Sequence, residues 1–205
     1  MKKLISTFAA LIITLSIGIF ASAQGTTYTV RSGDSMWKIA VRYEVGVSEL
    51  IKANPGIRNP NLIYPGQKIK IPEAAPLQTF ETEVIRLINI ERTSRGVPAL
   101  TTNWQLSRVA RYKSQDMIDK NYFAHQSPTY GSPFDMMEAF GLRFSAAGEN
   151  IAYGQRSARE VVNAWMNSPG HRANILSRAF TQTGVGAAKK ANGTLYWTQM
   201  FMKPT

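Results

Sequence analysis

Histidine is the scarcest residue in this 205-residue chain that could support acid–base or metal chemistry. The chain contains His125 and His171 and no cysteine. Imidazole titrates near neutral pH, and transition metals prefer imidazole, thiolate and carboxylate ligands, so such chemistry depends on these two residues together with carboxylates. His125 lies in the segment YFAHQSP and His171 in NSPGHRANIL. Without further context, a lone histidine is more often a buried, hydrogen-bonded core residue, and the sequence leaves both interpretations open.

The first 23 residues have the pattern of a secretory signal peptide. Lys2 and Lys3 precede an apolar run over residues 4–20, and Ala21-Ser22-Ala23 supplies the small residues that a signal peptidase reads. We expect cleavage after Ala23, export, and no integral membrane segment in the mature chain. An uncleaved membrane anchor is the alternative, because the apolar run is near the lower length limit for crossing a bilayer.

The chain is strongly basic, with a formal net charge of +11. Lys2 and Lys3 account for two of these charges, and the excess that remains after residue 23 is spread along the chain. Outside the cytoplasm, the polyanions available to such a protein are cell-wall polymers and anionic lipid headgroups. No basic run of the kind that marks a nucleic-acid arm is present, so we expect no nucleic-acid partner. Without cysteine the exported chain has no disulfides, and buried apolar surface must stabilise it.

Residues 27–72 have the pattern strand, helix, helix, strand. Residues 28–31 alternate as a strand, and the turn 32–35 carries side chains that can cap a helix beginning at residue 36. Gly46 ends that helix, and a second one runs from residue 47 to Asn54-Pro55. A tight turn at Pro65-Gly66 then precedes a second strand over residues 68–71.

Residues 28–72 resemble a LysM domain along their whole length. The shared features are the opening Y-x-V-x-x-G-D-S, the second-helix segment VSELIKAN and the ending L-I-x-P-G-x-x-I-x-I-P. The resemblance implies a βααβ module that binds N-acetylglucosamine-containing glycan, either peptidoglycan or a chitin-like polymer. The glycan-binding residues that we expect are Gly33, Asp34, Ser35, Met36, Asn54, Pro55, Ile63 and Tyr64. Gly33, Asp34 and Ser35 could also serve only to cap the helix, and the two roles are compatible. A single module should bind weakly.

Residues 73–79, EAAPLQT, are expected to form a linker to a second domain at residues 80–205. In that domain, helical periodicity predicts helices over residues 80–95, 104–121, 134–140 and 158–167. Strand-like segments at 184–188 and 194–202 are joined across Asn192-Gly193, which is a strong hairpin signal. Helices followed by a terminal hairpin indicate an α+β domain. We expect Ser168-Pro169-Gly170 to be a helix-ending turn and Trp165 and Trp197 to be core residues.

Four segments of this second domain carry its chemistry. They are His125 in YFAHQSP, Glu149 in AGENIAYG, His171 in NSPGHRANIL, and YWTQ near the C-terminus. Together they resemble the CAP superfamily (cysteine-rich secretory, antigen 5, pathogenesis-related 1) in its bacterial, cysteine-free form. The resemblance implies an α-β-α sandwich with one open cleft. In many members two histidines and two glutamates converge there and can hold a divalent metal.

Carried over residue by residue, the resemblance implies a metal site, for example for zinc, at His125, Glu149 and His171. Ser168 stands where many eukaryotic members have the second glutamate, so the set is incomplete. Asp135 and Glu138 are alternative carboxylates, but nothing in the sequence places them in the cleft. If the domain is an enzyme, the same three residues would be catalytic, with a metal-bound water or with Ser127 or Ser168 as nucleophile. The third interpretation is purely structural.

The order LysM then CAP resembles proteins of endospore-forming Gram-positive bacteria. We therefore expect a secreted protein of the cell wall or spore surface that binds peptidoglycan through its LysM domain. Its CAP domain would contact another wall or spore-coat protein, so we expect a binding protein rather than an enzyme. The alternatives are a metal-assisted hydrolase acting on wall peptide or glycan and, less favoured, a lipid-binding protein.

Overall fold

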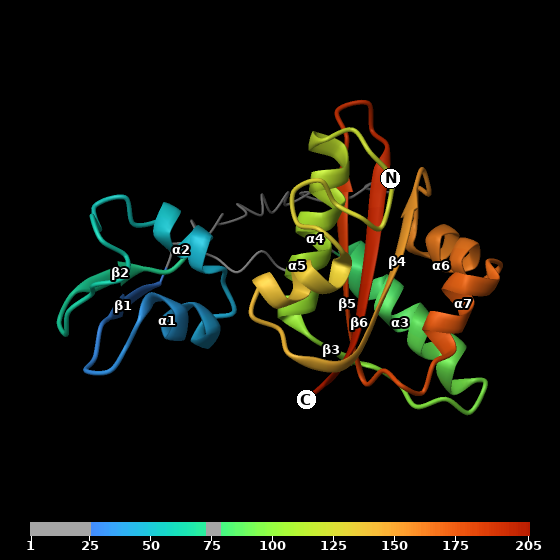
Figure 1. Ribbon diagram of the computed structural model, residues 1–205, viewed down its shortest axis with the longest axis horizontal. Helices are drawn as coiled ribbons and strands as arrows, with labels where there is room; N and C mark the ends of the chain where they lie inside the picture. The colour runs from blue at the N-terminus through green and yellow to red at the C-terminus, as the bar shows by residue number, and fades with distance from the viewer. Residues whose placement is uncertain (1–25, 73–78) are drawn as a thin grey trace, which may run out of the picture.

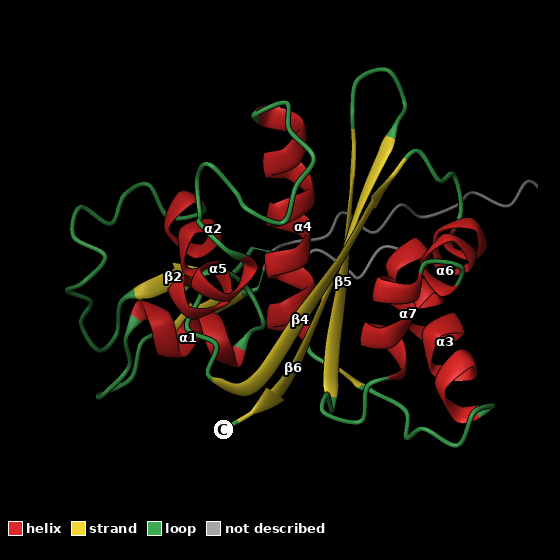
Figure 2. Cartoon of the chain, turned by 45° about the vertical axis from the view of Figure 1, so that its right-hand side comes forward, coloured by secondary structure: helices red, strands yellow, loops and turns green. Residues whose placement is uncertain are grey.

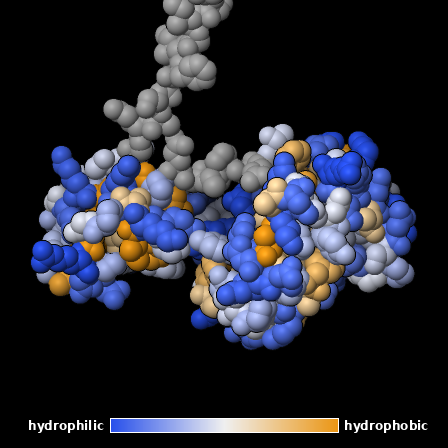
Figure 3. Space-filling view, turned by 90° about the horizontal axis from the view of Figure 1, so that it is seen from above, coloured by the Kyte–Doolittle hydropathy of each residue, from blue (hydrophilic) through white to orange (hydrophobic). Residues whose placement is uncertain are grey.

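The computed structural model describes residues 26–72 and 79–205, which form a small and a large domain (Figure 1). The expected signal peptide and residues 73–78 of the expected linker lie outside the described residues. Viewed from above, the two domains are separate lobes with mostly hydrophilic surfaces that small apolar areas interrupt (Figure 3). None of the helices in the described part of the chain has the length and apolarity that crossing a bilayer requires.

The small domain has the predicted βααβ order. It consists of β1 (Thr27–Thr29), α1 (Met36–Arg42), α2 (Val47–Lys52) and β2 (Lys68–Lys70). Strands β1 and β2 pair antiparallel, with Tyr28 opposite Ile69. The Ser35 side chain accepts a hydrogen bond from the Lys38 backbone N–H and caps α1. Apolar side chains from all four elements form one buried core, which consists of Tyr28, Val30, Met36, Ile39, Ala40, Val45, Leu50, Ile69 and Ile71.

The large domain is the predicted α-β-α sandwich. Its sheet has the strand order β3-β5-β6-β4, in which only β3 and β5 are parallel neighbours. The strands are β3 (Thr101–Thr102), β4 (Phe144–Tyr153), β5 (Gln182–Lys189) and β6 (Leu195–Pro204). Helices α4 (Trp104–Asp119) and α5 (Pro133–Ala139) cover one face, while α3 (Thr79–Thr93), α6 (Ala158–Met166) and α7 (Pro169–Leu176) cover the other (Figure 2).

Each face of the sheet has its own apolar core. One core joins α3, α6 and the sheet around the fully buried Val185 and Phe201, and it includes Trp165 and Trp197, as the sequence predicts. The other joins α4 and α5 to the sheet through Leu106, Met136 and Met200. The predicted hairpin is also present, since β5 and β6 pair through Lys189 and Leu195 and the turn contains Gly193 at φ +91°.

Two elements differ from the sequence-based expectations. The expected helix-ending turn at residues 168–170 is wrong in part, because Ser168 is the N-cap of α7 and Pro169 occupies its first turn. Proline is favoured there, since its missing N–H has no helical partner in the first turn. Strand β4 was not predicted, because buried polar residues, among them Glu149 and Asn150, interrupt its apolar pattern.

The carboxylate of Glu49 is the centre of the polar contact between the two domains, where Arg108 also donates to Ser48 Oγ at 3.2 Å. Glu49 of α2 accepts hydrogen bonds from Arg108 of α4, at 3.1 Å from Nε and 2.8 Å from Nη2, and from the Tyr112 hydroxyl. The Arg108 guanidinium also stacks on the rings of Tyr112 and Phe140, with its carbon 5.0 and 5.1 Å from the ring centroids. Gly46 permits the close approach, because a Cβ there would lie 2.0 Å from Arg108 Nη2.

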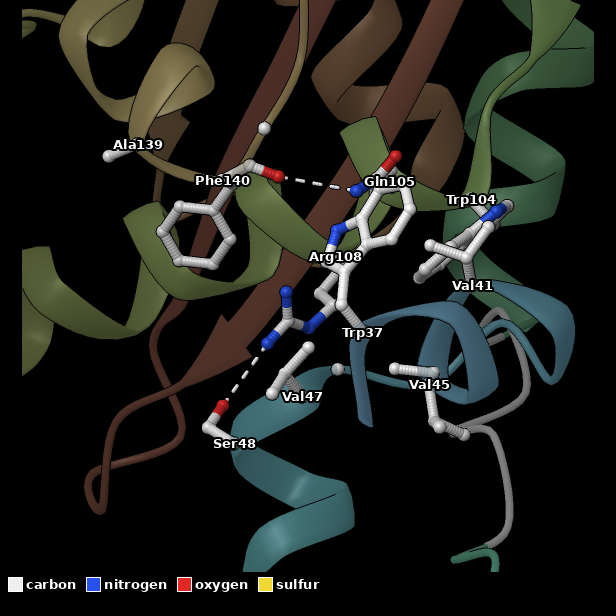
Figure 4. Close-up of a pocket in the computed structure, with 13 residues that line it drawn as sticks. Trp37, Val41, Val45, Val47, Ser48, Trp104, Gln105, Arg108, Ala139 and Phe140 are labelled. Carbon is white, nitrogen blue, oxygen red and sulfur yellow. Dashed lines mark hydrogen bonds between the residues drawn. The ribbon is translucent and has the colours of Figure 1, made fainter. Parts of the chain in front are cut away.

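A pocket of about 310 Å³ lies beside this contact and has walls from both domains. The small domain contributes Trp37 and Val45, and the large domain contributes Trp104, Arg108 and Phe140 (Figure 4). The pocket was not predicted, because no sequence pattern indicates which surfaces of two linked domains face each other.

We predict that the contact between the domains is lost at low pH. Burial alone would raise the pKa of Glu49, but the hydrogen bonds from Arg108, Tyr112 and Ser48 outweigh burial and lower that pKa from 4.5 to about 2. The docked state is therefore favoured above pH 4.5 and loses this preference as the pH falls towards 2. Small-angle scattering should show the full chain expanding over that range. Glu49→Gln should expand at pH 7, whereas the control Glu44→Gln, which changes an exposed glutamate of the same domain, should not.

We also predict that Gly186→Ala destabilises the large domain. A Cβ at Gly186 would lie 2.1 Å from the Arg111 backbone nitrogen of α4, so the helix would have to move away from the sheet. Overpacking of this kind costs about 3 kcal/mol of unfolding free energy. Gly170→Ala is the matched control, since nothing lies within 4 Å of a Cβ there. Equal denaturant midpoints for the two variants would contradict the prediction.

Candidate functional site

A histidine–carboxylate pair lies at the β4 edge of the sheet. His125, in the loop after α4, places Nδ1 2.6 Å from Oε1 of Glu149 on β4. The Glu149 side chain is 1% exposed, whereas the His125 side chain is 55% exposed. The buried carboxylate therefore orients an accessible imidazole through Nδ1 and leaves Nε2 as the ring nitrogen available to a ligand.

Two charged residues of α4 hold the loop that carries His125. The buried Lys113 ammonium donates to the His125 carbonyl oxygen at 2.6 Å. Burial lowers the pKa of Lys113, while the neighbouring carboxylates of Glu149 and Asp116 raise it. Asp116 accepts hydrogen bonds from three hydroxyls, at 2.6 Å from Tyr122, 2.7 Å from Ser127 and 2.6 Å from Thr129. The loop is thus bonded to α4 at the backbone carbonyl of the histidine and through side-chain hydroxyls on both sides of it.

Sequence reasoning missed both residues as parts of the site. Lys113 falls in the helical spacing of the apolar residues Leu106, Val109 and Met117, and a charge at such a position indicates a buried interaction. Asp116 lies three residues further along the same helix and is also buried. This pattern was the available signal for both residues.

His171 reaches the same edge from the other face of the sheet. It lies in α7, and burial followed by the charge of His125 lowers its pKa. Asn150 Nδ2 donates to the His171 carbonyl at 3.2 Å, and Asn174 Nδ2 donates to the Glu149 carbonyl at 3.1 Å. The structure therefore ties α7 to β4 at Glu149 and Asn150.

In the described structure, the three residues that the family resemblance implies as metal ligands are not clustered into a ready-made metal site. Glu149 uses Oε1 to bind His125 Nδ1, and its buried Oε2 has no hydrogen-bond partner in the structure. Within residues 26–72 and 79–205, no three His, Cys, Asp or Glu side chains are grouped so that they could hold an ion. The zinc site expected at His125, Glu149 and His171 stays a prediction, and the structure shows two of its residues as a hydrogen-bonded pair.

The other candidate residues have structural partners. Ser127 Oγ donates to Asp116 and accepts from the backbone N–H of Thr129, at 3.0 Å, and of Tyr130, at 2.9 Å. Asp135 forms a capping box with Ser132 at the start of α5. Ser168 is the N-cap position of α7. These bonds make Ser127 and Asp135 parts of the framework rather than a nucleophile and a ligand.

The expected glycan-binding residues divide into exposed and structural groups. Gly33, at φ +81°, Pro55 and Tyr64 are exposed, and Ile63 is half-buried. Met36 is buried in the small core. Asp34 accepts from the Tyr28 hydroxyl at 2.6 Å and from the Arg31 backbone N–H at 2.8 Å.

Asn54 is bonded to β2 and α2. Its side chain donates to the carbonyls of Lys70 at 2.7 Å and Leu50 at 2.8 Å and accepts from the Lys70 N–H at 2.8 Å. Lys70 lies opposite Thr27 at one end of the two-stranded sheet. The turn containing Tyr64 lies at the other end, next to the turn of Gly33. Two backbone hydrogen bonds of 2.9 Å place it there, from the N–H of Val30 to the Gln67 carbonyl and from the N–H of Gly66 to the Val30 carbonyl.

Family comparisons agree with this architecture. The model of the cysteine-rich secretory protein family, CAP, matches residues 85–201, and the LysM domain model matches residues 28–72. The chain belongs to the cysteine-rich secretory protein family. The predicted order of a LysM domain followed by a CAP domain is confirmed.

Three similar proteins place the chain among bacterial relatives. It is 51% identical over 138 residues to the uncharacterized protein YkwD of Bacillus subtilis (strain 168), a match covering 66% of this chain and 52% of YkwD. It is 50% identical over 52 residues to SpoIVD-associated factor A of the same organism, covering 25% of this chain and 13% of that protein. The crystal structure of an extracellular SCP-domain protein from Bacillus anthracis str. Ames has 33% identity and a TM-score of 0.58, with 67% of this chain and 47% of that chain covered. This chain thus spans about half the length of YkwD.

We predict that the full chain has no tight zinc site in the CAP domain. Calorimetric titration with zinc should give the same heats for the natural chain, His125→Ala and His171→Ala, because the described side chains form no group that could hold an ion. A saturable, equimolar binding isotherm that disappears in both variants would contradict this prediction and establish the zinc site. The thermal midpoint of each variant should be measured beside it, since His125 is bonded to Glu149.

Proposed function

We propose that this protein is exported and attaches to the cell wall or spore surface by binding peptidoglycan glycan through its LysM domain. LysM domains bind N-acetylglucosamine glycans, and the match over residues 28–72 is the observation that carries the proposal. A LysM domain joined to a CAP domain supports a cell-wall-binding protein. The spore surface is proposed because SpoIVD-associated factor A shares 50% identity over 52 residues.

The surface of the small domain supports a shallow glycan site. Tyr64 is 59% exposed and Leu62 is 52% exposed, so this segment presents an apolar surface to solvent. The neighbouring turn carries the exposed Gly33, whose carbonyl accepts from the Lys38 ammonium at 2.7 Å. A sugar has apolar ring faces and a polar rim, so an exposed aromatic ring beside backbone polar groups complements both parts.

The role proposed for the CAP domain is to contact a second wall or spore-coat component. A hydrolase acting on wall peptide or glycan is the second candidate, and one observation favours it. A buried carboxylate orienting an accessible imidazole is the arrangement of a general base. In the described structure, however, no serine hydroxyl is bonded to His125, and Ser127 is bonded to Asp116 instead. Binding is therefore the better supported function.

Sedimentation with insoluble peptidoglycan tests the attachment. We expect the full mature chain to pellet with the wall material and soluble N-acetylglucosamine oligomers to release it. Tyr64→Ala should weaken binding about tenfold, which corresponds to about 1.4 kcal/mol. Ile90→Ala is the control, since Ile90 is also an exposed apolar residue, at 48%, but lies on α3 of the CAP domain.

Failure of the natural chain to pellet, or unchanged binding by Tyr64→Ala, would argue against attachment through this surface. The same wall suspensions test the hydrolase. Release of soluble fragments by the natural chain but not by His125→Ala would favour catalysis over presentation.

A further inference from the structure

Three aromatic side chains form a continuous run of ring contacts on the CAP domain surface, with one pair edge-to-face and one pair stacked. The ring centroids of Phe123 and Tyr153 are 4.7 Å apart at an interplanar angle of 62°, and those of Tyr153 and Tyr196 are 5.6 Å apart at 24°. We call Phe123, Tyr153 and Tyr196 the aromatic ladder. Phe123 is 44% exposed and Tyr153 is 52% exposed, in contrast to the buried Trp165 and Trp197. The ladder is therefore not part of either core.

The backbone places the ladder on the same face of the sheet as the histidine–carboxylate pair. Tyr153 ends β4 and lies opposite Tyr196 of β6. Alternate residues of a strand point to one face, so Tyr153 shares its face with Glu149, four residues earlier. At a rise of about 3.3 Å per residue, the two positions are about 13 Å apart along β4. Phe123 is two residues before His125, so the loop held by α4 supplies one member of each group.

The surroundings of the ladder are polar and mainly basic. The exposed Lys120 and the side chain of Asn121 lie at the end of α4, where Lys190 Nζ is 3.4 Å from Asn121 Oδ1. Arg156 follows β4 by three residues and is exposed. The acidic residues of the same segments are Asp119 and Glu160, which accept from Gln115 Nε2 and from the Arg156 backbone N–H. Cations are thus in excess around an exposed aromatic surface.

We propose that the aromatic ladder is a second glycan-binding site, which takes the sugar rings of an anionic polysaccharide strand. The faces of aromatic rings carry partial negative charge and attract the slightly positive C–H groups of a pyranose ring. The phenol hydroxyls and the neighbouring amide and ammonium groups can bind sugar hydroxyls and carboxylates. We take this polysaccharide to be the glycan of the cell wall. The proposal therefore rests on the proposed function for the identity of its ligand.

A second glycan site explains how a protein with one weakly binding LysM domain could still attach to the wall. Two linked sites on one strand convert the second contact into an intramolecular event, and the affinity for a long polymer then exceeds that of either site by a large factor. Short oligomers cannot occupy both sites and gain nothing from the ladder. The strand would also pass along the face that carries Glu149, the partner of His125, about 13 Å from Tyr153 along β4.

Binding of soluble, linear peptidoglycan glycan strands to the full chain tests this proposal. We expect Phe123→Ala/Tyr153→Ala to weaken binding of long strands about tenfold or more and to leave binding of short N-acetylglucosamine oligomers unchanged. Phe134→Ala is the matched control, since Phe134 is a similarly exposed phenylalanine of the same domain outside the ladder. Tyr153→Phe should retain binding and Tyr153→Leu should lose it, because the flat ring is what stacks. Unfolding midpoints identify any variant that fails to fold.

A site-resolved signal separates this proposal from the attachment through LysM. In protein labelled with 3-fluorotyrosine, the ¹⁹F resonances of Tyr153 and Tyr196, assigned from their Tyr→Phe variants, should shift when long strands are added. They should still shift in the Tyr64→Ala background, at higher strand concentration.

If neither resonance moves and the double variant binds normally, the ladder is not a glycan site, whatever the LysM domain does. If the ladder responds while Tyr64→Ala has no effect, attachment through LysM fails and the ladder proposal stands. A stronger response to single-stranded DNA or to anionic phosphatidylglycerol vesicles than to glycan would overturn the choice of ligand.

Discussion

The close packing of α4 on β5 is the contact on which the functional parts of this molecule depend. Gly184 and Gly186 lack side chains where the backbone of α4 lies against the sheet, and a Cβ at either would be 2.1 Å from a helix nitrogen. The polar residues of α4 therefore stand at fixed distances from the strands. Lys113 and Asp116 reach the loop of His125 near one end of the helix, while Arg108 reaches the LysM domain near the other. One helix thus positions both the candidate site and the neighbouring domain.

Charge balance explains how α4 can bury polar groups against the sheet. An isolated buried ammonium or carboxylate is strongly disfavoured, whereas compensated charges are tolerated. Lys113 interacts with the carboxylates of Glu149 and Asp116, and Asp116 is further satisfied by three hydroxyls. This arrangement fixes the loop backbone without covering the His125 ring. The site therefore combines an immobile frame with an accessible imidazole, which suits a binding surface as well as it suits a general base.

The sequence predicts the repetitive parts of the fold better than the site. Helical spacing and the Asn192-Gly193 hairpin follow from local physics, and the α+β class follows from their order. The resemblance to CAP proteins selects His125, Glu149 and His171, but it does not show that Glu149 bonds to a ring nitrogen of His125. That bond depends on β4, whose polar centre hides its strand character, and on Lys113, whose partner is a backbone carbonyl twelve residues away. Long-range polar contacts of this kind leave no periodic signal in a single sequence.

The edge of the sheet at β4 constrains how a ligand can bind. An exposed edge strand ordinarily presents free backbone groups that can pair with another chain. Here the carbonyls of Glu149 and Ile151 accept from the side chains of Asn174, at 3.1 Å, and Trp165, at 3.2 Å. These bonds come from α7 and α6 and oppose the addition of a further strand along this part of β4. Recognition at this edge must then use side chains, and the accessible ones on the α4 face are the His125 imidazole and the rings of Phe123 and Tyr153, which suit a ligand with ring faces and hydroxyls better than an extended peptide.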